Sequence, residues 1–175
     1  DVTWDFNNRT ENAAVWEKAS NSDDYVITAG TGGVLDVTAT VEYEGETYTA
    51  EYSVLVIPHF TGVEIENIDA VYAPNIAVGQ TVTATVFTKG SPEFREDDYP
   101  GVELKYQWYK YDVSAGKSGP ISGATSDVYT ISEEGFAGAD QQYKISVQVT
   151  CGGQIVIPHD TTQKSVRTKD HSLLY

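Results

Sequence analysis

The side chains of this sequence that could do chemistry are mainly carboxylates, since it holds 26 Asp and Glu residues, 3 His and 1 Cys. Nucleophilic catalysis needs a Ser or Cys beside a base that a third group orients, and no Ser lies in a Gly-x-Ser-x-Gly elbow. Glycosidases need two carboxylates set across a cleft, and with so many acids the presence of a pair discriminates nothing. Phosphate loops, paired-Cys zinc motifs and calcium hands are also missing from the sequence. The sequence therefore predicts a protein that is not an enzyme.

One acidic loop is a candidate calcium site. Calcium takes several oxygen ligands from flexible loops, and solvated loop charge is the alternative interpretation. The carboxylates of this loop are Glu93, Glu96, Asp97 and Asp98. Asp23 and Asp24 form a weaker second candidate. His59 and His159 both end a Val-Ile-Pro-His segment, but they lack the supporting ligand spacing of a metal pair.

Three tyrosines are candidates for contact with a ligand, because outward aromatic rings stack on sugars or anchor a protein partner. Tyr109 and Tyr111 alternate with Trp108, so we expect them on the outward face of one strand. Tyr99 comes shortly before that strand. Outward tyrosines also commonly cover their cross-strand neighbours, so a binding role and a structural role are both open.

The strand that carries Tyr109 and Tyr111 is the most informative element of the sequence. Its apolar residues recur at every second position, which is typical of a half-buried β-strand. They are Val102, Leu104, Tyr106 and Trp108. A side chain as large as that of Trp108 needs a deep slot, and in an all-β chain such a slot lies between two packed sheets. The pattern predicts a β-sandwich with Trp108 in its core.

Four blocks follow in order: Tyr106-Gln107-Trp108-Tyr109-Lys110, Pro120-Ile121-Ser122-Gly123-Ala124-Thr125-Ser126, Tyr129-Thr130-Ile131 and Tyr143-Lys144-Ile145-Ser146-Val147. Over roughly residues 78–157 they resemble the immunoglobulin-like repeats of bacterial cell-surface and secreted multi-module proteins. In immunoglobulin folds the core Trp packs on a disulfide, and a Tyr lies two residues before one of its cysteines. This sequence has Tyr143 and then Ile145 at that place, so the resemblance implies an aliphatic contact instead of the disulfide.

The first part of the chain contains a second unit. Alternation from Val37 to Val56 about the Glu44-Gly45-Glu46 turn predicts a long hairpin with one apolar face. The pattern resembles the C-terminal portion of another repeat of the same kind. We therefore expect an all-β chain of two tandem immunoglobulin-like β-sandwich modules. Residues 1–58 form the first module, incomplete at its N-terminus or completed at an open edge by a neighbouring chain. Residues 59–160 form the second, and residues 161–175 are a tail or the start of a further module.

Composition restricts the partners. With 11 basic against 26 acidic residues, the net charge is −15. A surface this negative repels phosphate backbones and anionic lipid, so we expect no nucleic-acid partner. No apolar run is long enough to span a bilayer, so we expect no membrane insertion. A single Cys excludes an internal disulfide framework.

These observations favour a non-catalytic structural or adhesive segment of a bacterial cell-surface or secreted protein, located outside the cell. Its partners are then neighbouring modules of the same protein, and a glycan or a host or cell-surface protein. Apart from calcium we expect no cofactor. Two alternatives are a glycan-binding accessory module of a carbohydrate-active protein and a strand-donating subunit of a surface assembly.

Overall fold

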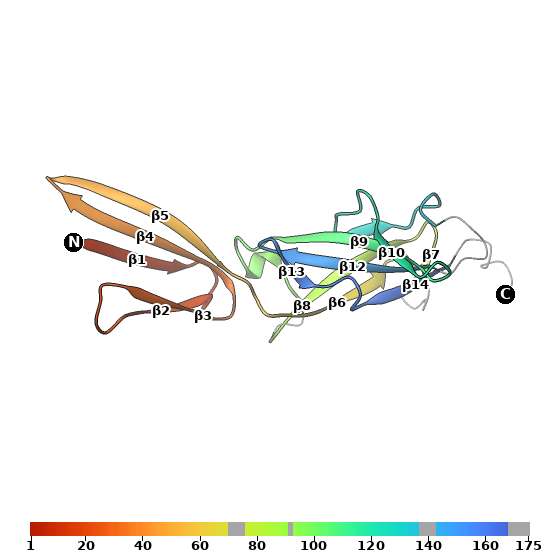
Figure 1. Cartoon of the computed structure of the whole chain (residues 1–175), viewed down its shortest axis with the longest axis horizontal. Coiled ribbons are helices and arrows are strands. Elements are labelled where there is room, and N and C mark those ends of the chain that lie inside the picture. The colour runs from red at the N-terminus through yellow and green to blue at the C-terminus, as the bar shows by residue number, and fades with distance from the viewer. Residues whose placement is uncertain (70–75, 91–92, 137–142, 168–175) are drawn as a thin grey trace. The chain divides into compact units, whose positions relative to one another are not determined.

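The computed structural model describes residues 1–69, 76–90, 93–136 and 143–167 (Figure 1). Within these ranges the chain is all-β, with strands β1 to β14, one short 3₁₀ helix, η1 (Glu96–Asp98), and no α-helix. The described part holds no helix that is long and apolar enough to cross a membrane. Contacts divide the chain into two units: unit 1 is Asp1–His59 with Phe94–Glu103, and unit 2 is Phe60–Glu93 with Leu104–Tyr175. The acidic segment of residues 94–103, expected in the second module, therefore groups with the first.

Unit 1 contains a three-stranded antiparallel sheet in the order β1-β4-β5 and a separate two-stranded hairpin. The sheet consists of β1 (Val2–Asn8), β4 (Gly33–Tyr43) and β5 (Glu46–Val56). The hairpin consists of β2 (Ala14–Lys18) and β3 (Tyr25–Ala29). Strands β4 and β5 are joined by Glu44 (φ 51°) and Gly45 (φ 81°), and positive φ at both residues is the backbone of a two-residue hairpin turn. The predicted long hairpin is confirmed.

Unit 2 contains two sheets. The larger runs in the order β10-β9-β12-β14-β7, and β13 also pairs with β12. Its strands are β7 (Ile76–Ala77), β9 (Leu104–Asp112), β10 (Lys117–Pro120), β12 (Tyr143–Cys151), β13 (Gln154–Ile157) and β14 (Gln163–Arg167). The smaller sheet runs β11-β8-β6 and consists of β6 (Phe60–Asn67), β8 (Thr81–Thr88) and β11 (Val128–Thr130). The strict alternation of buried and half-buried residues along β8 shows that this sheet presents one face to a core.

Trp108 connects the two sheets of unit 2. Its side chain is 0% exposed, and its ring lies 5.8 Å from that of Tyr129 on β11 of the smaller sheet. The indole Nε1 donates a 2.8 Å hydrogen bond to the backbone oxygen of Ser126, just before β11. On its own sheet Trp108 pairs with Val147 of β12, whose side chain is also buried. Two sheets joined through one buried indole are consistent with a β-sandwich.

Tyr143 and Ile145 also lie in the core of unit 2, with side chains 5% and 0% exposed. Lys110 of β9 lies beside them, since it pairs with Ile145 across the strands. Its ammonium group donates a 2.6 Å hydrogen bond to the backbone oxygen of Gly135 and lies 5.1 Å from the centre of the Tyr143 ring. This hydrogen bond and the nearby rings of Tyr143 and Phe136 replace part of the hydration that the Lys110 ammonium loses at the end of the core.

One boundary expected from the sequence needs correction. Gln163–Arg167, placed in a tail or a further module, forms β14 and pairs antiparallel with β12 and parallel with β7. Its Val166 side chain is buried. The strand escapes sequence analysis because its other residues are polar, so it lacks an alternating pattern. Residues 168–175 of the expected tail lie outside the described residues.

The one cysteine of the sequence, Cys151, ends β12 and is 1% exposed. Burial raises the pKa of its thiol, because a thiolate loses its hydration there. In this environment the side chain acts as a small hydrophobic residue.

The Trp108→Ala substitution will lower the free energy of unfolding by about 3–5 kcal/mol, because it leaves a large cavity in the core. Trp108→Phe will cost less but still destabilise, since the Ser126 oxygen loses its indole donor. Chemical denaturation followed by circular dichroism measures both. Tyr43→Ala is the control: that side chain is 63% exposed, so its change should stay within about 0.5 kcal/mol. An equal loss in Trp108→Ala and Tyr43→Ala would contradict the central place of Trp108.

Candidate functional site

The acidic loop proposed for calcium forms no cluster in the structure. Glu96, Asp97 and Asp98 make up the exposed turn η1. Among the described residues, which include Glu93, no three His, Cys, Asp or Glu side chains lie close enough to hold a metal ion. In the second candidate, Asp23 pairs with the Lys18 ammonium at 2.8 Å. The structure therefore does not support the calcium hypothesis at either place.

The three candidate tyrosines are all half-buried. The Tyr109 ring stacks on the imidazole of His159, with ring centres 4.1 Å apart and an angle of 12° between the planes. Tyr99 stacks on Phe94 at 5.1 Å, and Tyr111 lies between Lys144 and Ser118 in the strand register. One ring face of Tyr109 and one of Tyr99 are thus already occupied, which leaves less of each available to a ligand.

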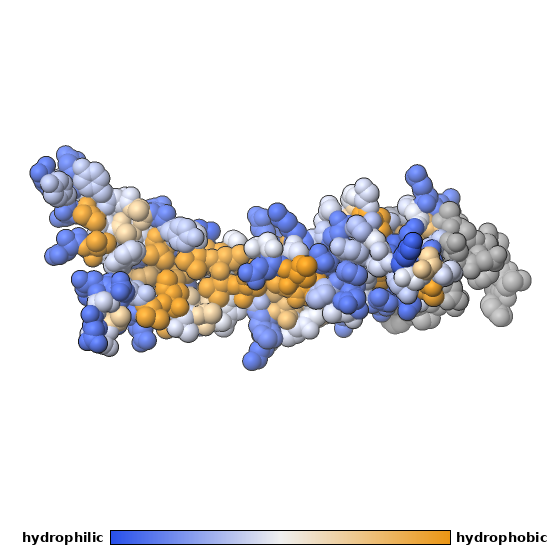
Figure 2. All heavy atoms as spheres, viewed as in Figure 1, coloured by the Kyte–Doolittle hydropathy of each residue, from blue (hydrophilic) through white to orange (hydrophobic). Residues whose placement is uncertain are grey.

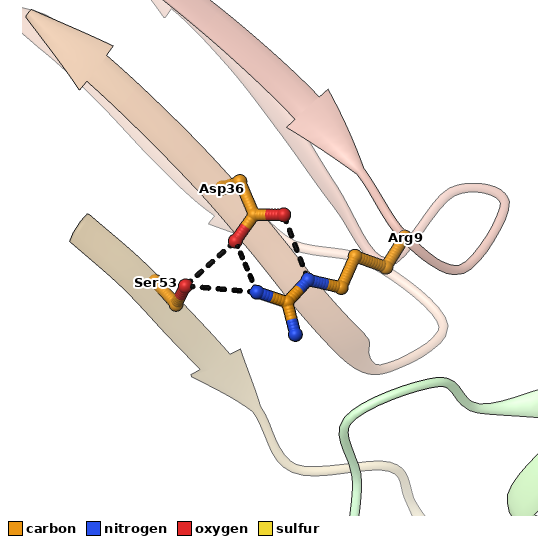
Figure 3. A network of polar contacts seen from close by, with 3 residues as sticks. All are labelled: Arg9, Asp36 and Ser53. Carbon is orange, nitrogen blue, oxygen red and sulfur yellow. Dashed lines mark hydrogen bonds and ion pairs between the residues drawn. The ribbon is translucent and has the colours of Figure 1, made fainter. Parts of the chain in front are cut away.

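Arg9, Asp36 and Ser53 form a polar network in unit 1 that the sequence did not predict (Figure 3). The Arg9 guanidinium donates from Nε to Asp36 Oδ2 at 2.7 Å and from Nη2 to Asp36 Oδ1 at 2.8 Å. Arg9 Nη2 also donates to Ser53 Oγ at 3.2 Å, and Ser53 Oγ donates to Asp36 Oδ1 at 2.6 Å. Arg9 follows β1, Asp36 lies on β4 and Ser53 on β5, so the network joins all three strands of the sheet.

This network lines an open hollow of about 620 Å³ on the polar side of the sheet. The hydrogen bonds from Arg9, and then from Ser53, lower the pKa of the Asp36 carboxyl by stabilising its charged form. The same Asp36 carboxylate raises the pKa of Arg9. Because the Asp36 carboxylate binds the Arg9 guanidinium bidentately and offsets its charge, the attraction of Arg9 for an anionic ligand is reduced.

The opposite side of the same sheet is apolar along all three strands. Direct cross-strand partners share a face, so the register places the following residues together. The apolar face consists of Val2, Trp4 and Phe6 of β1, Leu35, Val37, Ala39 and Val41 of β4, and Tyr48, Ala50, Tyr52 and Val54 of β5.

The β2–β3 hairpin covers one half of this apolar face. Leu35 and Val37 are buried there with Ala14 of β2, and Phe6 packs against the same cluster. The Phe6 ring stacks on Trp16 at 5.2 Å and meets Tyr25 at 5.0 Å. The covered half is therefore a small core of its own.

The other half of the apolar face is open to solvent. Val2 is 51% exposed, Trp4 43%, Tyr48 59% and Tyr52 73%. These side chains lie in neighbouring rows of the register, with Ala39 and Ala50 between them. Figure 2 shows hydrophobic residues at the surface over the β1, β4 and β5 region. Exposed apolar surface of this kind is common at the interaction sites of proteins.

The sequence predicts the apolar face and the Arg9–Asp36–Ser53 network only in part. Alternation along the hairpin predicts its apolar face, yet it cannot tell whether another element covers that face. Asp36 and Ser53 are direct cross-strand partners, and that pairing could have been derived from the predicted turn. The approach of Arg9 depends on how the chain leaves β1, which no local pattern determines.

Comparison with known proteins gives little further information. No family model matches the chain, and no curated protein matches it. Among solved structures, one similar chain comprises three N-terminal domains of the bacteriophage RB49 Highly Immunogenic Outer Capsid protein (Hoc), at 11% sequence identity. The alignment covers 96% of this chain and 57% of that one, with a TM-score of 0.34. That similarity is too low to support either a fold or a function for this chain.

We predict that calcium leaves the melting temperature unchanged relative to a chelator, because no carboxylate cluster is assembled in the described residues. Thermal denaturation in millimolar calcium and in chelator measures this. A Glu96→Gln, Asp97→Asn double variant serves as the control for any general effect of ionic strength. A calcium-dependent rise in the parent that this variant lacks would restore the calcium hypothesis.

We predict that Asp36→Asn makes unit 1 less sensitive to acid. Because the pKa of Asp36 is lowered in the folded state, its stabilising contribution is complete at neutral pH. That contribution is lost as the pH falls below the usual carboxyl range, about 4. Urea midpoints at pH 7 and pH 3 should therefore differ less in Asp36→Asn than in the parent. Glu44→Gln, at the exposed turn, is the control and should behave as the parent; equal acid losses in Asp36→Asn and the parent would contradict the prediction.

Proposed function

We propose that this chain is a non-catalytic interaction segment of a bacterial cell-surface or secreted protein, built from immunoglobulin-like β-modules. The four sequence blocks around Trp108 support the family, and the two sheets of unit 2 are consistent with a sandwich of this type. In this proposal unit 2 acts as a spacer or support, and unit 1 makes the contact.

The observation that carries the proposal is the open half of the apolar face in unit 1. Removing apolar surface from water contributes roughly 25 cal/mol per Å² before the entropic costs of association are subtracted, so covering this surface favours binding. Trp and Tyr are also the residue types that most often dominate binding energy at protein interfaces. A surface with Trp4, Tyr48 and Tyr52 exposed together is therefore suited to a protein partner.

The chemistry of the open half favours protein over carbohydrate. Sugar recognition combines an aromatic platform with hydrogen-bonding groups that fix the hydroxyls in place. Here the residues between the aromatic rings are Val41, Ala39 and Ala50, whose side chains neither donate nor accept. Neighbouring modules and host or cell-surface proteins are therefore the proposed partners.

The extracellular location rests on charge and on the sequence resemblance. A net charge of −15 keeps a protein soluble and repels nucleic acid and anionic lipid. These properties suit a module that works outside the cell.

The proposal is tested by measuring binding of the labelled 175-residue chain to intact bacterial cells and to purified extracellular-matrix proteins. We expect a protein interaction that the Tyr48→Ser, Tyr52→Ser double variant weakens at least tenfold, because both exposed rings are lost. Two matched changes in unit 2, Tyr109→Ser and Tyr111→Ser, should leave it intact. No binding to any of these proteins or cells, or binding that survives loss of Tyr48 and Tyr52, would contradict the proposal.

The same variants distinguish the glycan-binding alternative on a broad glycan array. A reproducible glycan signal that Tyr109→Ser abolishes, and that Tyr48→Ser, Tyr52→Ser retains, would place the function on unit 2 and favour a carbohydrate-binding module.

A further inference from the structure

Strand β5 forms one edge of the β1-β4-β5 sheet and has no strand on its outer side among the described residues. It runs for 11 residues, Glu46–Val56, and pairs with β4 over its whole length without a register shift. An edge strand offers alternating backbone N–H and C=O groups to solvent, which is a template for another strand.

The usual protections of such an edge are absent from β5. Proteins block exposed edges with proline, lysine, a bulge or a very short strand. Strand β5 contains no proline and no Lys or Arg, and its regular register excludes a bulge. Its charged residues are Glu46 and Glu51 alone, so the edge repels only an acidic partner.

The two faces of β5 specify the side chains that a neighbouring strand would need. On the apolar face the strand presents Tyr48, Tyr52 and Val54, and on the polar face Thr49, Glu51 and Ser53. Because side chains directly opposite each other in an antiparallel pair share a face, a matching strand alternates apolar with polar residues. Its apolar residues would extend the open half of the apolar face.

Charge determines which polar residues fit. Within residues 1–59 the Lys and Arg residues are Arg9 and Lys18 alone. Both are ion-paired, Arg9 with Asp36 and Lys18 with Asp23. Neither cation is therefore available to Glu51, and a partner strand beside β5 can supply one opposite it. A second copy of this chain is a poor source, since each copy carries a net charge of −15 and like charges oppose association.

We propose that the β5 edge binds an extended segment of a partner protein, in which apolar residues alternate with Lys or Arg. The segment adds a fourth strand beside β5. Its backbone bonds to the unpaired edge, its apolar side chains lie beside Tyr48 and Tyr52, and one of its cations lies across from Glu51. This inference rests on the proposed function, because it names the kind of partner that the interaction segment of unit 1 would take.

The test uses the full 175-residue chain and a short, labelled peptide of alternating valine and lysine with blocked ends. Fluorescence anisotropy gives its affinity, and hydrogen exchange reports protection of β5 amides. Two further peptides separate the contributions: one replaces lysine by glutamate, and one keeps the lysines but carries N-methyl groups that remove backbone donors. We expect the valine–lysine peptide to bind and to protect β5, and the other two to bind at least tenfold more weakly.

Charge reversal provides the matched pair of variants. Glu51→Lys should weaken the valine–lysine peptide by roughly three- to tenfold, the range that exchanging an attractive for a repulsive cross-strand pair gives. It should also strengthen binding of the valine–glutamate peptide. Glu17→Lys makes the same change in net charge at an exposed side chain of β2, and it should alter neither affinity by more than about twofold.

Three results would overturn the strand proposal. If the N-methylated peptide bound as tightly as the valine–lysine peptide, the attraction would come from charge and would not need backbone hydrogen bonds to β5. Equal effects of Glu51→Lys and Glu17→Lys would exclude a defined place opposite β5. Concentration-dependent dimers that protect β5 without peptide would identify a second copy as the occupant.

If none of the peptides binds while the Tyr48→Ser, Tyr52→Ser variant still loses its protein partner, the proposed function survives without strand addition. The reverse pattern would leave a strand-binding edge without the proposed function.

Discussion

Each strand of this chain has two faces, and an apolar face must be covered by another layer to contribute to stability. Unit 2 satisfies this constraint with two sheets, between which Trp108 is enclosed on all sides. Unit 1 satisfies it only in part, because its second layer is a two-stranded hairpin. The small core at Leu35 and Val37 ends where the hairpin ends, and beyond it aromatic side chains lie in water. In the proposed function, this difference in coverage is the reason why unit 1 contacts the partner and unit 2 does not.

The polar side of unit 1 is organised differently from the apolar side. The sheet is joined there by side chains that cross the strands, and Arg9, Asp36 and Ser53 form such a connection. On the apolar side, Asn8 shares a face with its cross-strand partner Leu35, and its amide both donates to and accepts from the Ala14 backbone, at 2.9 and 3.1 Å. That amide anchors the hairpin to the end of β1. A short sheet with half of its apolar face open thus depends on a few specific polar contacts.

The sequence predicts those features that depend on local alternation or on a short turn. The all-β class, the strand of Trp108 and the β4–β5 hairpin with its Glu44-Gly45 turn follow from spacing along the chain. Strand β14 does not follow, because Gln163 to Ser165 are polar and only the neighbouring strands make the segment extended. The carboxylates from Glu93 to Asp98 are close in sequence, but a metal site needs their oxygen atoms to point at one place. A run of acidic residues does not determine whether they do. The open aromatic surface is hidden from sequence for a related reason: alternation identifies a face, while its cover depends on elements distant along the chain.

Cys151 gives the chain an intrinsic reporter of motion. Its sulfur is enclosed at the end of β12, and unit 1 has no thiol, so an alkylating reagent modifies the protein only when the core of unit 2 opens around that strand. The rate of modification under native conditions therefore measures how often unit 2 opens, independently of unit 1. Covering the exposed surface of unit 1 with a partner should leave that rate unchanged if the two units open independently, and should slow it if they open together.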